Sequence, residues 1–236
     1  MNLKLKDKIK AVLFDLDGTL IGINLQAFIP DYLKLLSASV SHLIPPRKFI
    51  SKLLKASEMV NNNDGRDTNE NVYAKAFFPI EGYSREEIEP FFDRFYKNDF
   101  KKLKKHTTVI PEAREVVQTV FSKEYDVVIA TTPVIPLTAI QQRLEWAEVG
   151  DINYKLITSI ENTYATKPNL LYFTNIFKFL GYSAEECIMI GDEHKDMVCK
   201  ELGAKTFFIE GNNSDLNSET PNPTYRGKLI DLLNIL

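Results

Sequence analysis

The sequence predicts an α/β fold, in which a doubly wound parallel sheet carries helices on both faces and a helical domain is inserted. The first observation is a series of short apolar runs, each suited to one buried strand, at residues 11–14, 126–130, 155–158, 187–190 and 206–209. The second is that helical patterns separate most of these runs, as parallel strands require. The third is a long stretch, residues 23–108, with helical spacing. The core is therefore expected to be Rossmann-like.

The helices expected in the core have clear start and stop signals. A proline lies at or just before the first turn of each, where its missing N–H costs nothing. Two glycines, Gly181 and Gly203, are predicted to end helices because glycine adopts the left-handed backbone conformation easily. The helical patterns cover residues 112–122, 137–148 and 169–180.

The interval 23–108 is expected to be a helical domain, which leaves residues 1–22 and 109–236 for the core. Thr68 and Ser84 are predicted to cap two of its helices. The polar loop 61–67 is most simply a solvated turn. The four predicted helices span residues 26–39, 46–60, 68–78 and 85–102.

Composition restricts the classes of partner. The chain has 236 residues, 44% of them hydrophobic, and a net charge of −3, so neither nucleic acid nor a membrane is expected as the main partner. Cys187 and Cys199 are expected to stay reduced. The amino terminus lacks the apolar core of a signal peptide and no segment has membrane-spanning length, which predicts a cytoplasmic protein.

The first apolar run ends in two acids on alternate residues, Asp15 and Asp17, followed by Gly18. An Asp-Gly pair alone is typical of a solvated turn. Here, however, the acids follow a buried strand, at the sheet edge where parallel sheets bind ligands. Residues two apart on a strand point to the same side, so a cation, a proton or a backbone twist has to separate the two charges. This pattern favours a metal-dependent active site.

Three more polar positions follow later strands in chain order. Thr131 and Thr132 offer hydroxyls and backbone amides that could hold phosphate oxygens, although strand-ending threonines are commonly just strand formers. Lys167 precedes a predicted helix, where its ammonium group could neutralise an anion. Asp192 follows another apolar run and offers the oxygen ligand that Mg²⁺ prefers. The side chains are expected to converge at one edge of the sheet.

Taken together, these positions resemble the haloacid dehalogenase superfamily, in particular hydrolases of the phosphatase type with a helical, C1-type cap. The resemblance rests on Asp-x-Asp-Gly-Thr-Leu at 15–20, a strand-terminal threonine, Lys-Pro at 167–168 and Gly-Asp-x-x-x-Asp at 191–196, and it covers nearly the whole chain. It implies a Mg²⁺-dependent phosphatase that acts on a small phosphorylated metabolite through an aspartyl-phosphate intermediate. The interval 23–108 would then be the cap.

The resemblance also implies a role for each residue. Asp15 would be the nucleophile, and Asp17 the general acid and base. Asp15 and Asp192 would bind the metal through their carboxylates, and Asp17 through its main-chain carbonyl. Thr131 and Lys167 would hold the transferring phosphoryl group.

Positions beside these residues receive their own predictions. Thr132 stands where many relatives have asparagine and is a candidate for substrate contact, as is Arg66 in the polar loop. Asp196 either supports its loop or touches the metal. Whether Glu193 touches the metal is also left open by the sequence. His194 is expected to be solvated.

Other reactions and assemblies stay open in part. Within the superfamily, dehalogenases lack the second acid and need no metal, so Asp17 argues against that chemistry. A sugar phosphomutase shares the core residues, and a catalytically silent binding or regulatory module would share the fold. The chain is expected to be a monomer or a homodimer.

Overall fold

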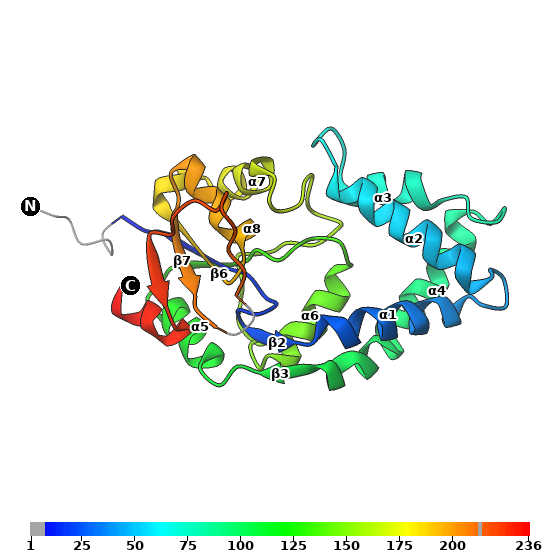
Figure 1. The fold of residues 1–236 in the computed structure, drawn as a ribbon, viewed down its shortest axis with the longest axis horizontal. Helices are drawn as coiled ribbons and strands as arrows, with labels where there is room; N and C mark the ends of the chain where they lie inside the picture. Colours follow the sequence, from blue (N-terminus) through cyan, green and yellow to red (C-terminus); the bar gives the residue numbers. More distant parts are fainter. Residues whose placement is uncertain (1–7, 212–213) are drawn as a thin grey trace, which may run out of the picture.

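The computed structural model describes residues 8–211 and 214–236. Residues 1–7, part of the predicted core segment and of the amino terminus that lacks a signal-peptide pattern, lie outside this range. Figure 1 shows a sheet flanked by helices at one end of the molecule and a group of helices at the other. The predicted α/β class with a parallel, Rossmann-like sheet is confirmed.

The sheet has six strands in the order β5-β4-β1-β6-β7-β8, and every described pairing between them is parallel. The strand at 11–14 was predicted with its observed bounds, and the other predicted strands differ by one or two residues. The last strand was not predicted. The strands are β1 (Ala11–Phe14), β4 (Asp126–Ile129), β5 (Leu156–Ile157), β6 (Cys187–Gly191), β7 (Lys205–Ile209) and β8 (Tyr225–Gly227).

Strand β1 lies in the middle of the sheet and is fully buried, as its four apolar residues require. Phe14 is in register with Ile129 of β4 and with Ile190 of β6. The three strands therefore end at the same level, and the residues that follow them meet at one edge. The backbone continues this alignment, because Asp15 N–H donates to the Ile190 carbonyl at 2.9 Å.

Helices cover both faces of the sheet. Val12 and Phe14 pack into the apolar cluster that contains α5 and α6, whereas Leu13 packs on the other face with α7. Gly181 ends α7 in the left-handed conformation, with φ 74°, as predicted. Within the described part of the chain, no helix is long and apolar enough to span a membrane. The core helices are α5 (Ala113–Ser122), α6 (Leu137–Trp146), α7 (Leu170–Leu180), α8 (His194–Met197) and the 3-10 helices Ala184–Glu186, Val198–Leu202 and Leu229–Asn234.

A two-stranded antiparallel ribbon, β2 (Ile21–Ile23) and β3 (Thr107–Val109), connects the sheet to the inserted helices. The ribbon was not predicted. The predicted helix 85–102 is divided in the structure: the α-helix ends at residue 98, and a separate 3-10 helix follows. Thr68 caps the third helix as expected, since its side chain accepts from Asn71 N–H. The helices are α1 (Leu25–Ser39), α2 (Pro46–Asn61), α3 (Asn69–Phe77), α4 (Arg85–Asn98) and η2 (Phe100–His106).

The inserted helices are attached to the core by both apolar and polar contacts. Phe100 stacks on Trp146 of α6, with ring centroids 5.4 Å apart. Asn69 is fully buried, and its backbone N–H donates to the Thr163 carbonyl at 2.8 Å. Its side-chain amide also accepts from Asn63 at 2.8 Å. The loop 61–67 was predicted as a solvated turn, and this is wrong for Asn63, which is buried where the helices meet the core.

Candidate active site

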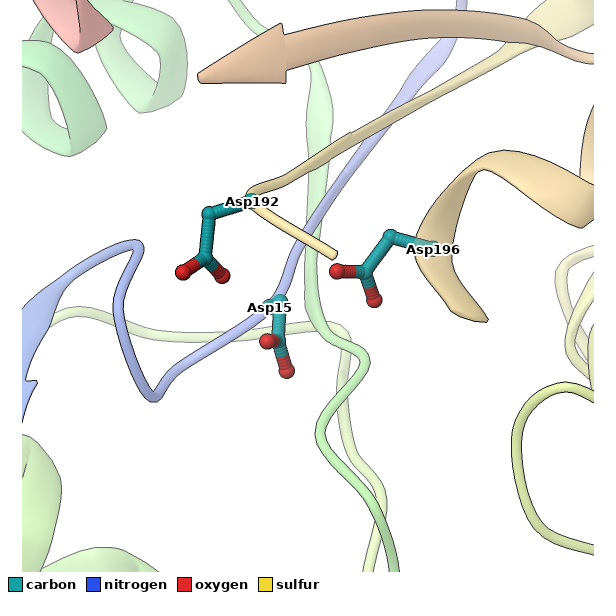
Figure 2. Close-up of side chains that lie close together, drawn as sticks. All are labelled: Asp15, Asp192 and Asp196. Carbon is teal, nitrogen blue, oxygen red and sulfur yellow. The ribbon is translucent and has the colours of Figure 1, made fainter. Parts of the chain in front are cut away.

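Three carboxylates converge at the carboxyl edge of the sheet (Figure 2). Asp15 follows β1, Asp192 follows β6 and Asp196 lies in α8. One oxygen of each lies within 4.8 Å of the others, and the three residues are between 0% and 5% exposed. The parallel register of β1 and β6 explains this meeting, because it ends both strands at the same level.

Lys167 lies between two of these acids. Its Nζ is 2.8 Å from Asp15 Oδ1 and 2.5 Å from Asp196 Oδ1, and its side chain is fully buried. Burial opposes the charge of this ammonium group, but the two carboxylates outweigh burial and raise the pKa of Lys167 above its ordinary value. The lysine is therefore a permanent cation beside Asp15.

One lysine does not balance three buried carboxylates. Burial, together with the nearby charges of Asp15 and Asp196, raises the pKa of Asp192 to about 8. Burial likewise raises the pKa of Asp196, against the opposing effect of Lys167. Ionising three neighbouring buried carboxylates together is costly unless a cation lies between them. Their ligand atoms are all oxygens, which a hard divalent cation such as Mg²⁺ prefers.

Two glycines make this close approach of acids possible. A Cβ atom on Gly18, whose φ is +79°, would lie 2.0 Å from Asp192 Oδ2. A Cβ atom on Gly191 would lie 2.3 Å from the Asp196 carboxyl carbon. Any other residue at either position would push a carboxylate out of the cluster. Thr19 adds a hydroxyl 3.4 Å from Asp192 Oδ1.

Asp17 has a different partner. Its side chain is 30% exposed, and its Oδ1 forms an ion pair with Nη2 of Arg143 from α6. Burial lowers the pKa of Arg143 to about 10, which leaves the guanidinium charged at neutral pH. Sequence reasoning missed Arg143. A signal existed, because Arg143 follows the buried residues Ala139 and Ile140 at helical spacing and so belongs to the inner face of α6.

The two threonines after β4 are also buried or nearly so. The Thr131 carbonyl accepts from the Tyr172 hydroxyl at 2.9 Å and from Thr158 Oγ1 at 3.0 Å. These two hydrogen bonds hold the loop after β4 in place. Neither Tyr172 nor Thr158 was identified from the sequence. Thr132 Oγ1 is buried and has no hydrogen-bond partner among the described residues. A ligand oxygen would satisfy it.

The remaining predicted positions lie around the acids or away from them. Arg66 pairs with Asp64, and its side chain is 89% exposed. Glu193 pairs with Lys195, and its backbone N–H donates to Asp196 Oδ2 at 3.2 Å. His194 is partly exposed, and its Nδ1 lies 2.9 Å from Thr220 Oγ1.

Residues 9–198 match the family model of haloacid dehalogenase-like hydrolases. The chain belongs to this family. The match includes the strands that carry Asp15 and Asp192 and the inserted helices between them. The resemblance found in the sequence is thereby confirmed, and the protein is a hydrolase.

Several known proteins are similar to this hydrolase. The pyrophosphatase PpaX of Bacillus cereus (strain AH820) is 24% identical over 220 residues, covering 84% of this chain and 82% of the relative. A HAD phosphatase from Thermococcus onnurineus matches with a TM-score of 0.58 and 19% identity over 96% of this chain and 97% of the other. L-2-haloacid dehalogenase from Xanthobacter autotrophicus matches with a TM-score of 0.57 and 16% identity over 96% of this chain and 97% of the other. These structural likenesses show the fold, so the reaction has to be argued from this chain's own residues.

Both thiols of the hydrolase are buried and unpaired. Burial raises the pKa of Cys187 to about 12, so its thiol stays protonated at neutral pH. Cys187 is therefore not an activated nucleophile.

Proposed function

We propose that this hydrolase is a Mg²⁺-dependent phosphomonoesterase that acts on a small phosphorylated metabolite. The observation that carries the proposal is the environment of Asp15. A fully buried lysine contacts this carboxylate at 2.8 Å, and Asp192 and Asp196 lie within 4.8 Å of it, which makes an acidic cluster suited to a cation. The pyrophosphatase and the HAD phosphatase among the similar proteins agree with phosphoryl transfer.

Asp15 is the proposed nucleophile and Asp17 the proposed acid and base. A carboxylate oxygen of Asp15 attacks phosphorus, the bond from phosphorus to the ester oxygen breaks, and that oxygen takes a proton from Asp17. Water then attacks the aspartyl phosphate and gives a proton to Asp17, while the bond from phosphorus to Asp15 breaks. Alcohol and inorganic phosphate leave, and both aspartates return to their initial states.

The other residues hold the phosphoryl group and balance its charge. Lys167 reduces the repulsion between Asp15 and the incoming phosphate anion. Thr131 and Thr132 are proposed to donate to phosphoryl oxygens, and the unpartnered Thr132 hydroxyl supports this role. Mg²⁺ would be held by Asp15, Asp192 and the Asp17 main-chain carbonyl, and when bound it supplies positive charge that lowers the barrier to attack. Asp196 is proposed to hold Lys167.

Asp17 favours a phosphatase over a dehalogenase. Displacement of halide needs no protonated leaving group, whereas an alkoxide leaving from phosphorus does. A second acid two residues after the nucleophile therefore has a role in ester hydrolysis that it lacks in dehalogenation. A phosphomutase would use the same residues, and product analysis distinguishes it.

We propose that residues 23–108 form a cap and that the organic part of the substrate lies beneath it. A cavity of about 360 Å³ between these helices and the core supports this proposal. Tyr32, Tyr73 and Phe92 line it from the helices, and Ile135 and Pro136 line it from the loop that also carries the two threonines. A volume of this size suits a small molecule.

The protein is further proposed to act in the cytoplasm as a monomer or homodimer, without nucleic-acid or membrane partners. Two buried, unpaired thiols agree with a reducing compartment.

A screen of sugar phosphates, nucleotides and phosphorylated organic acids tests the proposed function. We expect release of inorganic phosphate that depends on Mg²⁺ and is lost in Asp15→Asn, whereas the matched surface variant Asp99→Asn keeps full activity. Asp99 is exposed and pairs only with Lys102 among the ion pairs described. Conversion of a sugar phosphate into its isomer without phosphate release would indicate a phosphomutase. Inactivity on every compound, with substrate binding retained, would favour the silent binding module.

A further inference from the structure

Arg143 is a buried cation whose hydrogen-bond donors are not all paired. Its side chain is 6% exposed, its Nη2 forms an ion pair with Asp17, and its Nε has no hydrogen-bond partner among the described residues. Burying a guanidinium group whose donors are not all paired costs free energy. The charge that faces it is the carboxylate of Asp17.

The contact involves one oxygen of Asp17. Oδ1 faces Arg143 and is buried, although the Asp17 side chain as a whole is 30% exposed. The exposed part of Asp17 lines a cleft together with Gly18, Asp192 and Glu193. Arg143 therefore approaches Asp17 from the core, while the rest of the carboxyl group faces the cleft beside Asp192.

Helix α6 holds Arg143 in a fixed position for this contact. Arg143 lies one turn after the buried Ala139 and Ile140, and Leu144 and Trp146 anchor the same helix in the core. The helix begins after the loop that carries the two threonines. A rigid helix thus holds the guanidinium against a residue in the loop between β1 and β2, which has no regular hydrogen-bonding ladder of its own.

We propose that Arg143 is a positioning residue, which holds the carboxyl group of Asp17 so that its free oxygen points at the leaving oxygen of the substrate. This inference rests on the proposed function, in which Asp17 gives a proton to that oxygen. Because Arg143 acts through Asp17, its substitution should have the largest effect on substrates whose leaving oxygen needs a proton. A purely structural ion pair would affect all substrates equally.

The leaving group of the substrate provides the test. An alkyl phosphate needs a proton on its departing oxygen, whereas 2,4-dinitrophenyl phosphate releases an anion that is stable without one. Positioned acid catalysis is worth roughly 10²- to 10⁴-fold in rate. We expect Arg143→Gln to lower kcat/KM, which reports the formation of the aspartyl phosphate, by about 10- to 100-fold on an alkyl phosphate, a part of that range, and by less than about 3-fold on the dinitrophenyl ester.

Three further variants complete the experiment. Asp17→Asn combined with Arg143→Gln should be no slower than Asp17→Asn alone, because a residue that acts by positioning Asp17 has no effect once that acid is removed. Arg143→Lys should recover part of the loss and also serves if the glutamine variant unfolds. Arg114→Gln is the matched control, since Arg114 makes an exposed ion pair with Asp151. Orthovanadate binding and thermal unfolding report whether each variant keeps its fold.

Two results would overturn the inference. One is an equal loss of kcat/KM on both esters in folded Arg143→Gln and Arg143→Lys proteins. The other is a double variant whose loss is the product of the two single losses. If the wild-type protein shows no hydrolysis that depends on Asp15, the proposed function fails and this inference fails with it, so the two failures are told apart by the wild-type measurement.

Discussion

The carboxyl edge of the sheet and the inserted helices are built in different ways. At the sheet edge, Asp15 and Asp192 are positioned by backbone register alone, because each directly follows a strand. In the inserted helices, the interior consists of aromatic rings such as Phe49 and Phe77, whose centroids lie 5.5 Å apart. The first region depends on short local motifs and the second on long-range packing. Substitutions in the two regions should therefore have separable effects on catalysis and stability.

The largest effect is expected for Asp17→Asn. Loss of the acid and base should lower kcat by roughly 10²- to 10⁴-fold and leave substrate binding intact. Steady-state kinetics measure kcat, and isothermal titration measures substrate binding. Turnover near that of the wild-type protein would remove Asp17 from the proposed mechanism.

A packing substitution in the inserted helices should lower stability strongly and kcat only weakly. Phe49 is fully buried, and Phe49→Ala should lower the free energy of unfolding by about 3–5 kcal/mol because it leaves a cavity. The kcat of the molecules that remain folded should fall far less than in Asp17→Asn. Chemical denaturation gives the stability, and Leu54→Ala, at an exposed site, is the control. Equal destabilisation by both variants would contradict the packing described for this region.

The acidic cluster should make stability depend on pH. Burial raises the pKa of Asp192 to about 8 in the folded protein, above the ordinary aspartate value, so the folded state holds a proton that the unfolded state has lost. Stability without metal should therefore fall as pH rises from about 4, near the ordinary aspartate pKa, to about 8. Mg²⁺ should raise Tm more at the upper end of this range, where Asp192 is ionised.

Thermal unfolding with Mg²⁺ or with EDTA checks this expectation. Asp192→Asn removes the ionisable group and should flatten the pH dependence of Tm. A Tm that is independent of pH and of Mg²⁺ in the wild-type protein would argue against the metal site.

The smallest effect is expected for Arg66→Ala. The side chain is 89% exposed and pairs with Asp64, so kcat and KM should change by less than about 2-fold. A large rise in KM on one substrate, absent in Asp64→Ala, would instead show that Arg66 reaches that substrate, as its place in the polar loop first suggested.

The same contrast explains what the sequence could predict. Strand β1 is four apolar residues followed by acids, and it pairs with two other apolar runs, so the meeting of Asp15 and Asp192 follows from the alternation of strands and helices. The three-residue strands of the β2 and β3 ribbon are too short to show any periodicity. Strand β8 is equally short.

Buried polar residues were the hardest to predict. Tyr172 bonds a carbonyl 41 residues away, and Asn69 bonds Thr163 at a separation of 94 residues. No local pattern encodes such a partner, because tyrosine and asparagine are common on helix surfaces. Arg143 was missed as well, although its spacing after Ala139 and Ile140 on α6 offered a signal.

The central claim is that Asp15 becomes phosphorylated during turnover, and mass spectrometry of acid-quenched protein tests it directly. Incubation with a turned-over substrate and Mg²⁺ should add one phosphoryl group to the peptide that contains Asp15, and Asp17→Asn should accumulate more of it because water is no longer activated. A protein that hydrolyses the substrate while this peptide stays unmodified in both forms would contradict the account.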